Sequence, residues 1–357
     1  MGTAAAFPTS PAAVSCDWLT DRLRAAGAVT DAAVTAVEWQ PIGTGQVGDS
    51  ARFALSYDRP DAGPLTLAGK FAAADPTSRH TAVTHGLYAK EVAFYRELAA
   101  HLAIRTPRAF AAEVAADGAT FVLLFEDLGP ARGGNQLAGC GIDDALEAVR
   151  QLAGLHAPSW NNPAFVDRRW FAPRPGALES LQAAYPYATR IFAERYADDL
   201  APELMDICCE LSARSDRWFG REAGDRCLVH GDYRLDNMLF EIRGGAEPLG
   251  VLDWQTLQVG SGLTDLAYFL GAGVGTSLLA HEDALIDAYL AAMAARGVAL
   301  TREAVWDDYR RGALHGVSTA VFSAAFVERT ARGDAMFLDM ARGACQLALR
   351  HDSLAAL

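Results

Sequence analysis

The chain has 357 residues, of which 51% are hydrophobic and 21% charged, an ordinary globular composition that excludes a largely disordered or fibrous protein. Its net charge of −13 argues against nucleic acid or an anionic membrane as the main partner, because phosphate-rich partners are bound through excess Lys and Arg. The length exceeds that at which one hydrophobic core usually stops growing, so we expect two lobes.

Cysteine usage and the N-terminal residues predict a cytoplasmic location. The 6 cysteines are scattered, with no CxxC pair and no metal-like spacing, which is typical of a reducing compartment. The first residues lack the basic and apolar segments of a signal peptide, and no apolar run reaches the roughly 18 residues of a membrane span. We therefore expect a soluble cytoplasmic protein without a membrane partner.

The first part of the chain is predicted to be rich in strands. Apolar residues recur at helical spacing over 16–27 and 88–102. Strand-like runs occupy 33–42, 51–57, 65–71 and 120–126. The last of these runs leads into a Gly-Pro break at 129–130, which we take as the boundary of the first lobe.

The rest of the chain is predicted to be mainly helical. Ala- and Leu-rich helices are expected over 143–157, 176–218 and 265–357, with short strands within 227–232, 237–242 and 248–254. This order predicts an α+β fold of two lobes. We divide it into a small β-rich N-lobe, residues 1–128, and a larger helical C-lobe, residues 129–357.

A glycine-rich segment, "GTGQVG", lies between the first two predicted strands and contains Gly43, Gly45 and Gly48. Glycines let backbone N–H groups approach a phosphate closely, because no Cβ obstructs them. Strand rather than helix follows, which argues against a Rossmann fingerprint, and Asp49 stands where a Walker A loop has its lysine. The segment is either an ordinary hairpin turn or a loop that covers nucleotide phosphates.

Lys70 is a lone lysine at the end of the apolar strand "LTLAGKF". By itself it could be an edge lysine whose head reaches solvent. Glu91, on the next predicted helix, favours another interpretation, because kinases hold a strand lysine against the α- and β-phosphates by pairing it with a helix glutamate. We therefore predict that Lys70 and Glu91 form this pair.

The stretch "HGDYRLDN" matches the kinase catalytic-loop pattern H-x-D-x-x-x-x-N. In that pattern the carboxylate of Asp232 accepts the proton of the substrate hydroxyl, and the amide oxygen of Asn237 ligates Mg²⁺. Arg234 follows two residues after the base, and we assign it a contact with the γ-phosphate. Asp236 is given only a role in the hydrogen bonding of the loop.

Two further aspartates follow predicted strands or begin helices. Asp253 in "PLGVLDW" stands at a strand end, where a second Mg²⁺-ligating carboxylate belongs. Asp265 in "TDLAYFL" starts a helix, and we expect it to support the catalytic loop rather than take part in chemistry. His156 lies on an apolar helix face, so we expect a hydrogen-bonded core histidine rather than a ligand.

Taken together, these residues resemble those of the aminoglycoside phosphotransferase and choline kinase-like superfamily. The resemblance rests on "GTGQVG", Lys70, Glu91, "EDL", "LHA", "HGDYRLDN", "LDWQ" and "DLAYFL", in the order found in the family. Within the superfamily, the chain is most similar to the ecdysteroid kinase-like branch and to the kinase-like domains of some acyl-CoA dehydrogenases. The resemblance implies a protein-kinase-like fold, ATP and Mg²⁺ as cofactors, and adenine at a hinge containing Phe125, Glu126 and Leu128.

The predicted function is transfer of the ATP γ-phosphoryl group to an alcohol on a small molecule. Residues 233–236 read Tyr-Arg-Leu-Asp where aminoglycoside kinases often have Leu-His-Pro-Gly, which argues against an aminoglycoside as acceptor. The acceptor is expected to lie against the segments 176–218 and 280–345, whose apolar composition favours a hydroxyacyl or sterol-like compound. Two alternatives remain: a nucleotide-binding pseudokinase or regulatory module, and a protein kinase. Only eleven residues separate Asp253 from Asp265, which leaves no room for an ordinary activation loop.

Overall fold

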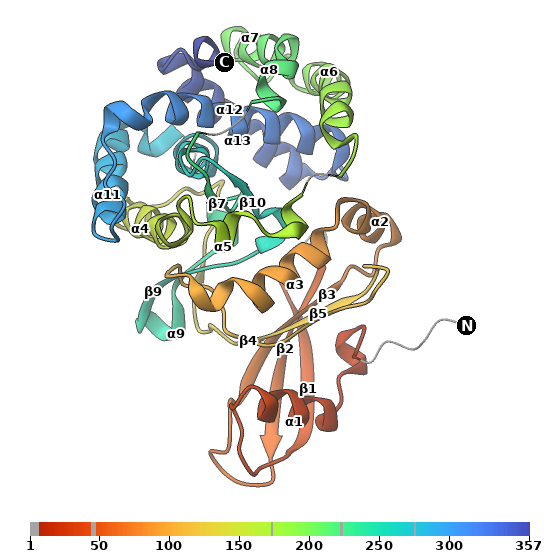
Figure 1. The fold of residues 1–357 in the computed structure, drawn as a ribbon. Helices are drawn as coiled ribbons and strands as arrows, with labels where there is room; N and C mark the ends of the chain where they lie inside the picture. Colours follow the sequence, from red (N-terminus) through yellow and green to blue (C-terminus); the bar gives the residue numbers. More distant parts are fainter. Residues whose placement is uncertain (1–6, 44–47, 173, 222–223, 275) are drawn as a thin grey trace. The chain divides into compact units, whose positions relative to one another are not determined.

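The computed structural model describes residues 7–43, 48–172, 174–221, 224–274 and 276–357 (Figure 1). The chain divides into two compact units. Unit 1 comprises residues 1–101, 106–130 and 252–256, and unit 2 comprises residues 102–105, 131–251 and 257–357. The division at residue 128 stays a prediction about domains, since the units interleave along the chain.

Unit 1 is built on a five-stranded antiparallel sheet in the order β1-β2-β3-β5-β4. Its strands are β1 (Val34–Ile42), β2 (Gly48–Tyr57), β3 (Thr66–Ala72), β4 (Ala109–Val114) and β5 (Phe121–Glu126). Its α-helices in the described ranges are α1 (Cys16–Ala25), α2 (Pro76–His85) and α3 (Leu87–Glu97). Ile42 pairs with Ser50, so the glycine-rich segment joins two paired strands, as predicted.

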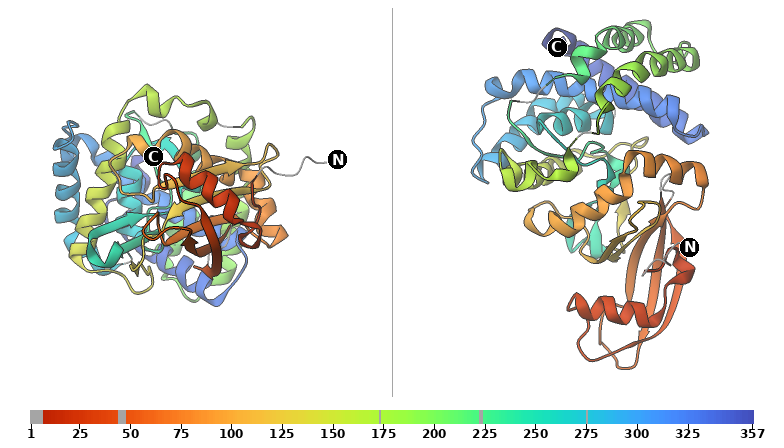
Figure 2. Two further views of the ribbon diagram at one scale, coloured as in Figure 1. Left: turned by 90° about the horizontal axis from the view of Figure 1, so that it is seen from below. Right: turned by 45° about the vertical axis from the view of Figure 1, so that its right-hand side comes forward.

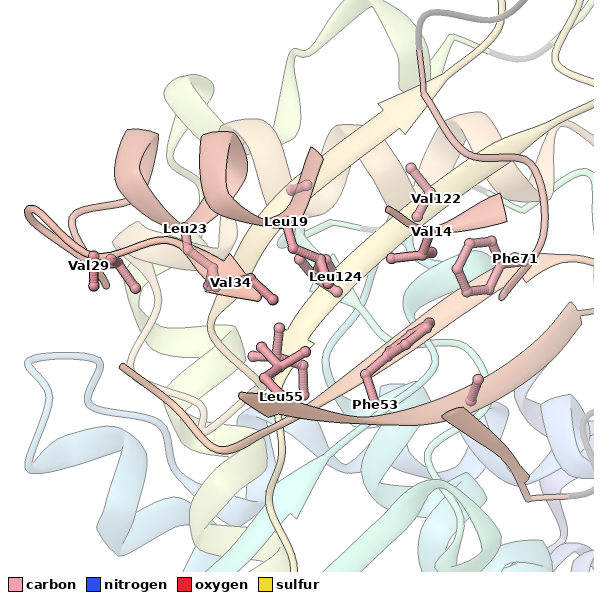
Figure 3. Close-up of a cluster of buried hydrophobic side chains, with 14 residues drawn as sticks. Val14, Leu19, Leu23, Val29, Val34, Phe53, Leu55, Phe71, Val122 and Leu124 are labelled. Atoms are coloured by element: carbon pink, nitrogen blue, oxygen red, sulfur yellow. The ribbon is translucent and has the colours of Figure 1, made fainter. Parts of the chain in front are cut away.

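Two apolar clusters hold the helices of unit 1 to its sheet. Leu19 and Leu23 of α1 are fully buried and pack with Phe53 of β2 and Leu124 of β5 in one cluster (Figure 3). A second cluster joins α3 to the strands, and in it the ring of Tyr88 stacks on Phe121 at 4.2 Å between centroids. This burial fixes α3, which carries Glu91, against β3, which carries Lys70.

Unit 2 is mainly helical (Figures 1 and 2). Its α-helices are α4 (Ile142–Ser159), α5 (Pro163–Val166), α6 (Ala177–Tyr196), α7 (Pro202–Ala213), α8 (Ser215–Phe219), α9 (Ile242–Gly245), α10 (Leu263–Tyr268), α11 (Glu282–Ala294), α12 (Arg302–Phe326) and α13 (Ala331–Arg350). Its strands form two small antiparallel sheets: β6 (Arg132–Gly133), β8 (Met238–Glu241) and β9 (Glu247–Val251) in one, β7 (Cys227–Val229) and β10 (Gln258–Gly260) in the other. Among the described residues, no helix has the length and apolar character needed to cross a membrane.

Two short segments belong to a different unit from the residues on either side of them in the sequence. Residues 102–105 join unit 2, where the N–H of Ala103 donates to the carbonyl of Gly154 and the carbonyl of Arg105 accepts from Val251. Residues 252–256 join unit 1, where Trp254 stacks on Phe94 with 4.0 Å between ring centroids. As a result, Asp253 lies in the same unit as Lys70.

Candidate active site

The loop after β7 is held by one buried carboxylate. Asp265, in the first turn of α10, is completely buried and accepts hydrogen bonds from the backbone N–H groups of His230 at 2.6 Å and Gly231 at 2.9 Å. Gly231 has φ of +82°, a conformation that strongly favours glycine. Asp265 thus has the supporting role predicted for it, since it ties the chain just before Asp232 to α10.

His156 of α4 completes this support. Its Nε2 lies 3.3 Å from Asp265, its Nδ1 lies 2.9 Å from the hydroxyl of Tyr289, and the ring is fully buried. Burial raises the pKa of Asp265, but the hydrogen bond and charge of His156 outweigh burial and lower the pKa below its ordinary value. The prediction of a hydrogen-bonded core histidine is confirmed.

The carboxylate of Asp232 is surrounded by donors. The hydroxyl of Tyr268 donates to Oδ1 at 2.6 Å, and Nδ2 of Asn237 donates to Oδ2 at 2.9 Å. Nε of Arg234 lies 2.9 Å from Oδ1 and 3.0 Å from Oδ2. Burial raises the pKa of Asp232, but the charge of Arg234 and the bond from Tyr268 outweigh it and hold the pKa below its ordinary value. The group is therefore a carboxylate at neutral pH.

The guanidinium of Arg234 donates to acidic side chains of its own loop. Besides Asp232, its Nη1 donates to Asp236 at 3.0 Å, and only 16% of the side chain is exposed. Burial lowers the pKa of Arg234, but the charges of Asp232 and Asp236 outweigh burial and raise it above its ordinary value. A contact of Arg234 with a γ-phosphate stays a prediction, and it would require the guanidinium to leave these carboxylates.

Asp236 has a larger part than its sequence position indicates. Its Oδ1 accepts from the backbone N–H of Gln136 at 3.0 Å, and its Oδ2 accepts from Arg332 of α13 at 2.9 Å as well as from Arg234. Gly134 lies so close to the loop that a Cβ there would be 2.0 Å from the carbonyl of Leu235. Asp236 therefore connects the catalytic loop to the 134–136 segment and to α13.

Tyr268 and His315 were not predicted from the sequence. Tyr268 is the last residue of α10 and is followed by a π-helical turn, Phe269–Gly273, a feature frequent at functional sites. The ring of His315, on α12, lies 5.2 Å from that of Tyr268, and its Nε2 is 2.8 Å from the carbonyl of Gly231. The sequence offers only one signal for Tyr268, its place in the motif "DLAYFL", because its partner Asp232 is distant in sequence.

The predicted ligands of Mg²⁺ have suitable chemistry. The amide nitrogen of Asn237 donates to the carbonyl of Asp232 at 2.8 Å and to the carboxylate of Asp232 at 2.9 Å. The amide oxygen of Asn237 is therefore the atom suited to ligate Mg²⁺. Asp253 offers carboxylate oxygens, and 29% of its side chain is exposed. Such hard oxygen donors suit Mg²⁺, which is usually held by one or two protein ligands together with substrate phosphates. Within the part of the chain that the structure describes, no group of three or more His, Cys, Asp and Glu residues forms a metal cluster.

Lys70 meets two carboxylates in unit 1. Its Nζ lies 2.9 Å and 2.7 Å from the oxygens of Glu91, and 2.9 Å from Oδ1 of Asp253. Burial lowers the pKa of Lys70, but the charges of Asp253 and Glu91 outweigh burial and raise it above its ordinary value. The structure thus brings together the predicted pair and adds Asp253 to it.

Asp253 has an unusual backbone conformation. Its φ is +63°, in the left-handed region that few non-glycine residues adopt and that recurs at functional sites. Its side chain bonds both Lys70 and Nε2 of Gln255, the latter at 3.2 Å. The strained residue is therefore held by side-chain contacts on each oxygen.

The remaining predicted residues belong to the glycine-rich segment and the hinge. Gly43 has φ of +73°, Gly48 is buried in β2, and Gly45 lies outside the described residues. Phe125 and Leu128 are buried, at 8% and 3% exposure. The N–H of Glu126 donates to the carbonyl of Arg108 at 3.0 Å, and the carboxylate of Glu126 accepts from the N–H of Arg108 at 2.8 Å. Binding of adenine there stays a prediction.

Comparison with known proteins supports the fold. The chain resembles a solved structure described as a candidate aminoglycoside phosphotransferase from Ralstonia eutropha JMP134, with a TM-score of 0.52, 16% identity, and coverage of 93% of this chain and 98% of the other. A microcompartment-associated aminopropanol kinase gives a TM-score of 0.47 at 17% identity, covering 95% of this chain and 99% of the other. The two-lobed, protein-kinase-like α+β fold predicted from the sequence is confirmed.

Comparison of sequences gives the family. One curated relative, acyl-CoA dehydrogenase family member 11 of Mus musculus, is 46% identical over 44 residues, which cover 12% of this chain and only 6% of the relative. Residues 69–311, more than half of the chain, match the family model APH, described as a phosphotransferase enzyme family. The chain therefore belongs to the phosphotransferase enzyme family.

Proposed function

We propose that this phosphotransferase transfers the γ-phosphoryl group of ATP to a hydroxyl of a small molecule. The observation that carries the proposal is the Asp232 carboxylate, which is ionised and is positioned by Tyr268 and Asn237. A positioned carboxylate in the loop after β7 is what a kinase needs to accept the proton of an acceptor hydroxyl.

In the proposed reaction, the acceptor oxygen forms a bond to the γ-phosphorus while the bond from that phosphorus to the bridging β–γ oxygen breaks. The bridging oxygen keeps the electron pair and leaves on ADP, and the hydroxyl proton passes to Asp232. Lys70, held by Glu91, is proposed to bind the α- and β-phosphates. Asn237 and Asp253 are the proposed ligands of Mg²⁺, which when bound neutralises charge on the phosphate oxygens.

Other residues have proposed parts in nucleotide binding. Gly43, Gly45 and Gly48 would cover the phosphates, and the hinge of Phe125, Glu126 and Leu128 would receive adenine. Arg234 is proposed to contact the γ-phosphate. In that case the nucleotide would draw the guanidinium from Asp232 and leave the carboxylate oxygens open to the acceptor.

The favoured acceptors are apolar hydroxyacyl or sterol-like compounds. The short match to an acyl-CoA dehydrogenase family member makes hydroxyacyl compounds the first to test, and aminoglycosides rank lower. We also propose that the protein acts in the cytoplasm, since all 6 cysteines are free.

A nucleotide-binding regulatory module is the second candidate. The observation that favours it is that Arg234 contacts both oxygens of Asp232, because a base that stays occupied in this way cannot accept a proton. The two candidates differ in turnover: the module would bind ATP and leave every acceptor unchanged.

The test is a measurement of ADP formation from ATP and Mg²⁺ with a panel of hydroxyacyl-CoAs, hydroxysteroids, choline and aminoglycosides. We expect one class to be phosphorylated, Asp232→Asn to lower kcat at least about a hundredfold, and Asp253→Ala to abolish turnover while the protein still melts cooperatively. Tyr233→Phe is the matched control, because that hydroxyl donates to the carbonyl of Ala148 rather than to Asp232. ATP binding without turnover of any acceptor would favour the regulatory module, and absence of Mg²⁺-dependent ATP binding would exclude both.

A further inference from the structure

Aromatic side chains follow one face of α12 away from the catalytic loop. His315, Phe322 and Phe326 are spaced by seven and four residues, which places them on the same side of the helix. At 1.5 Å per residue, Phe322 lies about 10 Å and Phe326 about 16 Å along the axis from His315. The face therefore extends well beyond the catalytic loop.

Rings from two other helices join this face. The ring of Phe219 of α8 lies 5.8 Å from that of Phe322, and Phe322 lies 6.0 Å from Phe326. Tyr187 of α6 continues the series at 6.3 Å from Phe326. We call these four residues the aromatic surface. Helix α6 contacts both α8 and α12, so the surface has a continuous base (Figure 1).

The aromatic surface is open to solvent. Phe326 is 55% exposed and Tyr187 50% exposed, while Phe219 and Phe322 are half-buried. Contiguous exposed apolar patches on soluble proteins mark sites that bind a partner or ligand. No element in the described part of unit 2 buries Phe326 or Tyr187, which leaves both rings accessible to a ligand.

One end of this face is continuous with Asp232. His315 lies 2.8 Å from the carbonyl of Gly231 and 5.2 Å, ring to ring, from Tyr268. Tyr268 in turn donates to Asp232 at 2.6 Å. A molecule whose hydroxyl reaches Asp232 would therefore meet the side of α12 that carries the aromatic rings.

Two arginines and one glutamate lie beside the aromatic surface. The guanidinium of Arg221 lies 3.5 Å from the ring centroid of Trp218, and that of Arg190 lies 5.2 Å from the ring of Tyr187. Arg190 has a glutamate partner, Glu194, at 3.9 Å. Burial together with the charge of Arg311 lowers the pKa of Arg221 to about 10, which leaves it cationic at neutral pH. These charges disfavour a polycationic acceptor and suit a neutral or anionic one.

We propose that the aromatic surface binds the apolar body of the acceptor, with the acceptor hydroxyl at Asp232 and the body running along α12 from His315 toward Phe326. This inference rests on the proposed function and specifies its substrate: an amphipathic alcohol with an apolar portion of about 10 to 16 Å, neutral or anionic, rather than an aminoglycoside.

The experiment measures binding of three probes to the full chain by titration calorimetry with ADP and Mg²⁺ present. The probes are 12-hydroxydodecanoate, 6-hydroxyhexanoate and kanamycin. We expect the longer hydroxy acid to bind at least about tenfold more tightly than the shorter one, because it covers more of the aromatic surface. Phe322→Ala should weaken binding of the longer probe by about tenfold or more and leave that of ADP unchanged.

Further variants separate the outcomes. Phe326→Ser changes a residue that is 55% exposed, and it should also weaken binding of the longer probe, whereas Leu349→Ser, at a position 52% exposed on α13, should not. Equal binding of both hydroxy acids, no binding of the longer one, tighter binding of kanamycin, or a dimer in light scattering that Phe326→Ser dissociates would overturn the inference. Failure of the proposed function would be seen separately, as absence of ADP binding with the probe preference intact.

Discussion

The hydrogen bond from Tyr268 to Asp232 gives the sharpest prediction. Replacement of Tyr268 by Phe removes one hydroxyl, which lies 2.6 Å from Oδ1 of the carboxylate, and keeps the buried ring. A hydrogen bond to a charged group contributes about 1.5 to 3 kcal/mol, and one pKa unit corresponds to about 1.4 kcal/mol. We therefore expect the substitution to raise the pKa of Asp232 by about one to two units.

The sign of the pH effect follows from the direction of the pKa. Burial raises the pKa of Asp232 in the fold, but Arg234 and Tyr268 lower it by more, so the folded pKa is below the unfolded value. The carboxylate therefore stabilises the fold above its unfolded pKa of about 3.9. That stability is lost as the pH falls through the folded pKa. In Tyr268→Phe this loss begins at higher pH, and the acid limb of any activity profile moves in the same direction.

The assay is an NMR titration of protein with ¹³C-labelled aspartate side chains, in which the Asp232 signal is identified by its absence from Asp232→Asn. The control is Tyr233→Phe, which removes a hydroxyl that donates to Ala148 at 2.7 Å and does not touch the carboxylate. A pKa of Asp232 that is the same in Tyr268→Phe as in the control would refute the reasoning.

Three further predictions concern the supports of the site and the core. Asp265→Asn places an amide against the N–H groups that donate to the carboxylate, so we expect a loss of about 2 to 4 kcal/mol in the free energy of unfolding, measured by urea titration at pH 7. Because the folded pKa of Asp265 is lowered, this difference should shrink as the pH falls below the unfolded pKa of about 3.9 and on through the folded pKa. An unchanged midpoint at pH 7 would contradict this. Glu91→Gln removes a charge from Lys70 and should weaken ADP–Mg²⁺ binding about tenfold or more in calorimetry while unit 1 stays folded; unchanged affinity would argue against the proposed role of the pair. Leu19→Ala in the fully buried cluster of unit 1 should cost about 2 to 5 kcal/mol in thermal or urea unfolding, and a loss below about 1 kcal/mol would mean that α1 is not held by this cluster.

The elements missed by sequence patterns have weak local signals. Helix α2 reads "PTSRHTAVTH", which is polar and has only Ala82 buried, so hydrophobic periodicity could not reveal it. Strand β4 reads "AFAAEV", rich in alanine, which has low strand propensity. Strand β10 has three residues and exists through its pairing with β7. Of these three elements, β10 alone depends on a segment distant in sequence, since β4 pairs with the next strand, β5, and the side chain of Asp75 caps the start of α2 by accepting from the N–H of Ser78.

The sequence by itself determined the identities of the residues that the proposed chemistry requires. The spacing in "HGDYRLDN" places Asp232 and Asn237 in one loop, where a direct bond of 2.9 Å now joins them. The strand position of Lys70 and the helix position of Glu91 predicted a pair that the structure confirms at 2.7 Å. Such features are local or depend on neighbouring elements, so the order of residues along the chain is enough to predict them.

Only the tertiary structure decided which distant groups hold these residues. Arg332 reaches Asp236 across 96 positions, and Asp265 reaches His230 across 35. Tyr268 contacts Asp232 because α10 ends beside the loop that carries this aspartate, and the rings of α6 and α8 meet those of α12 because the helices pack there. Spacing along a chain fixes distances only over a few residues, so the supports of the site and the aromatic surface depend on how buried apolar faces bring remote helices together.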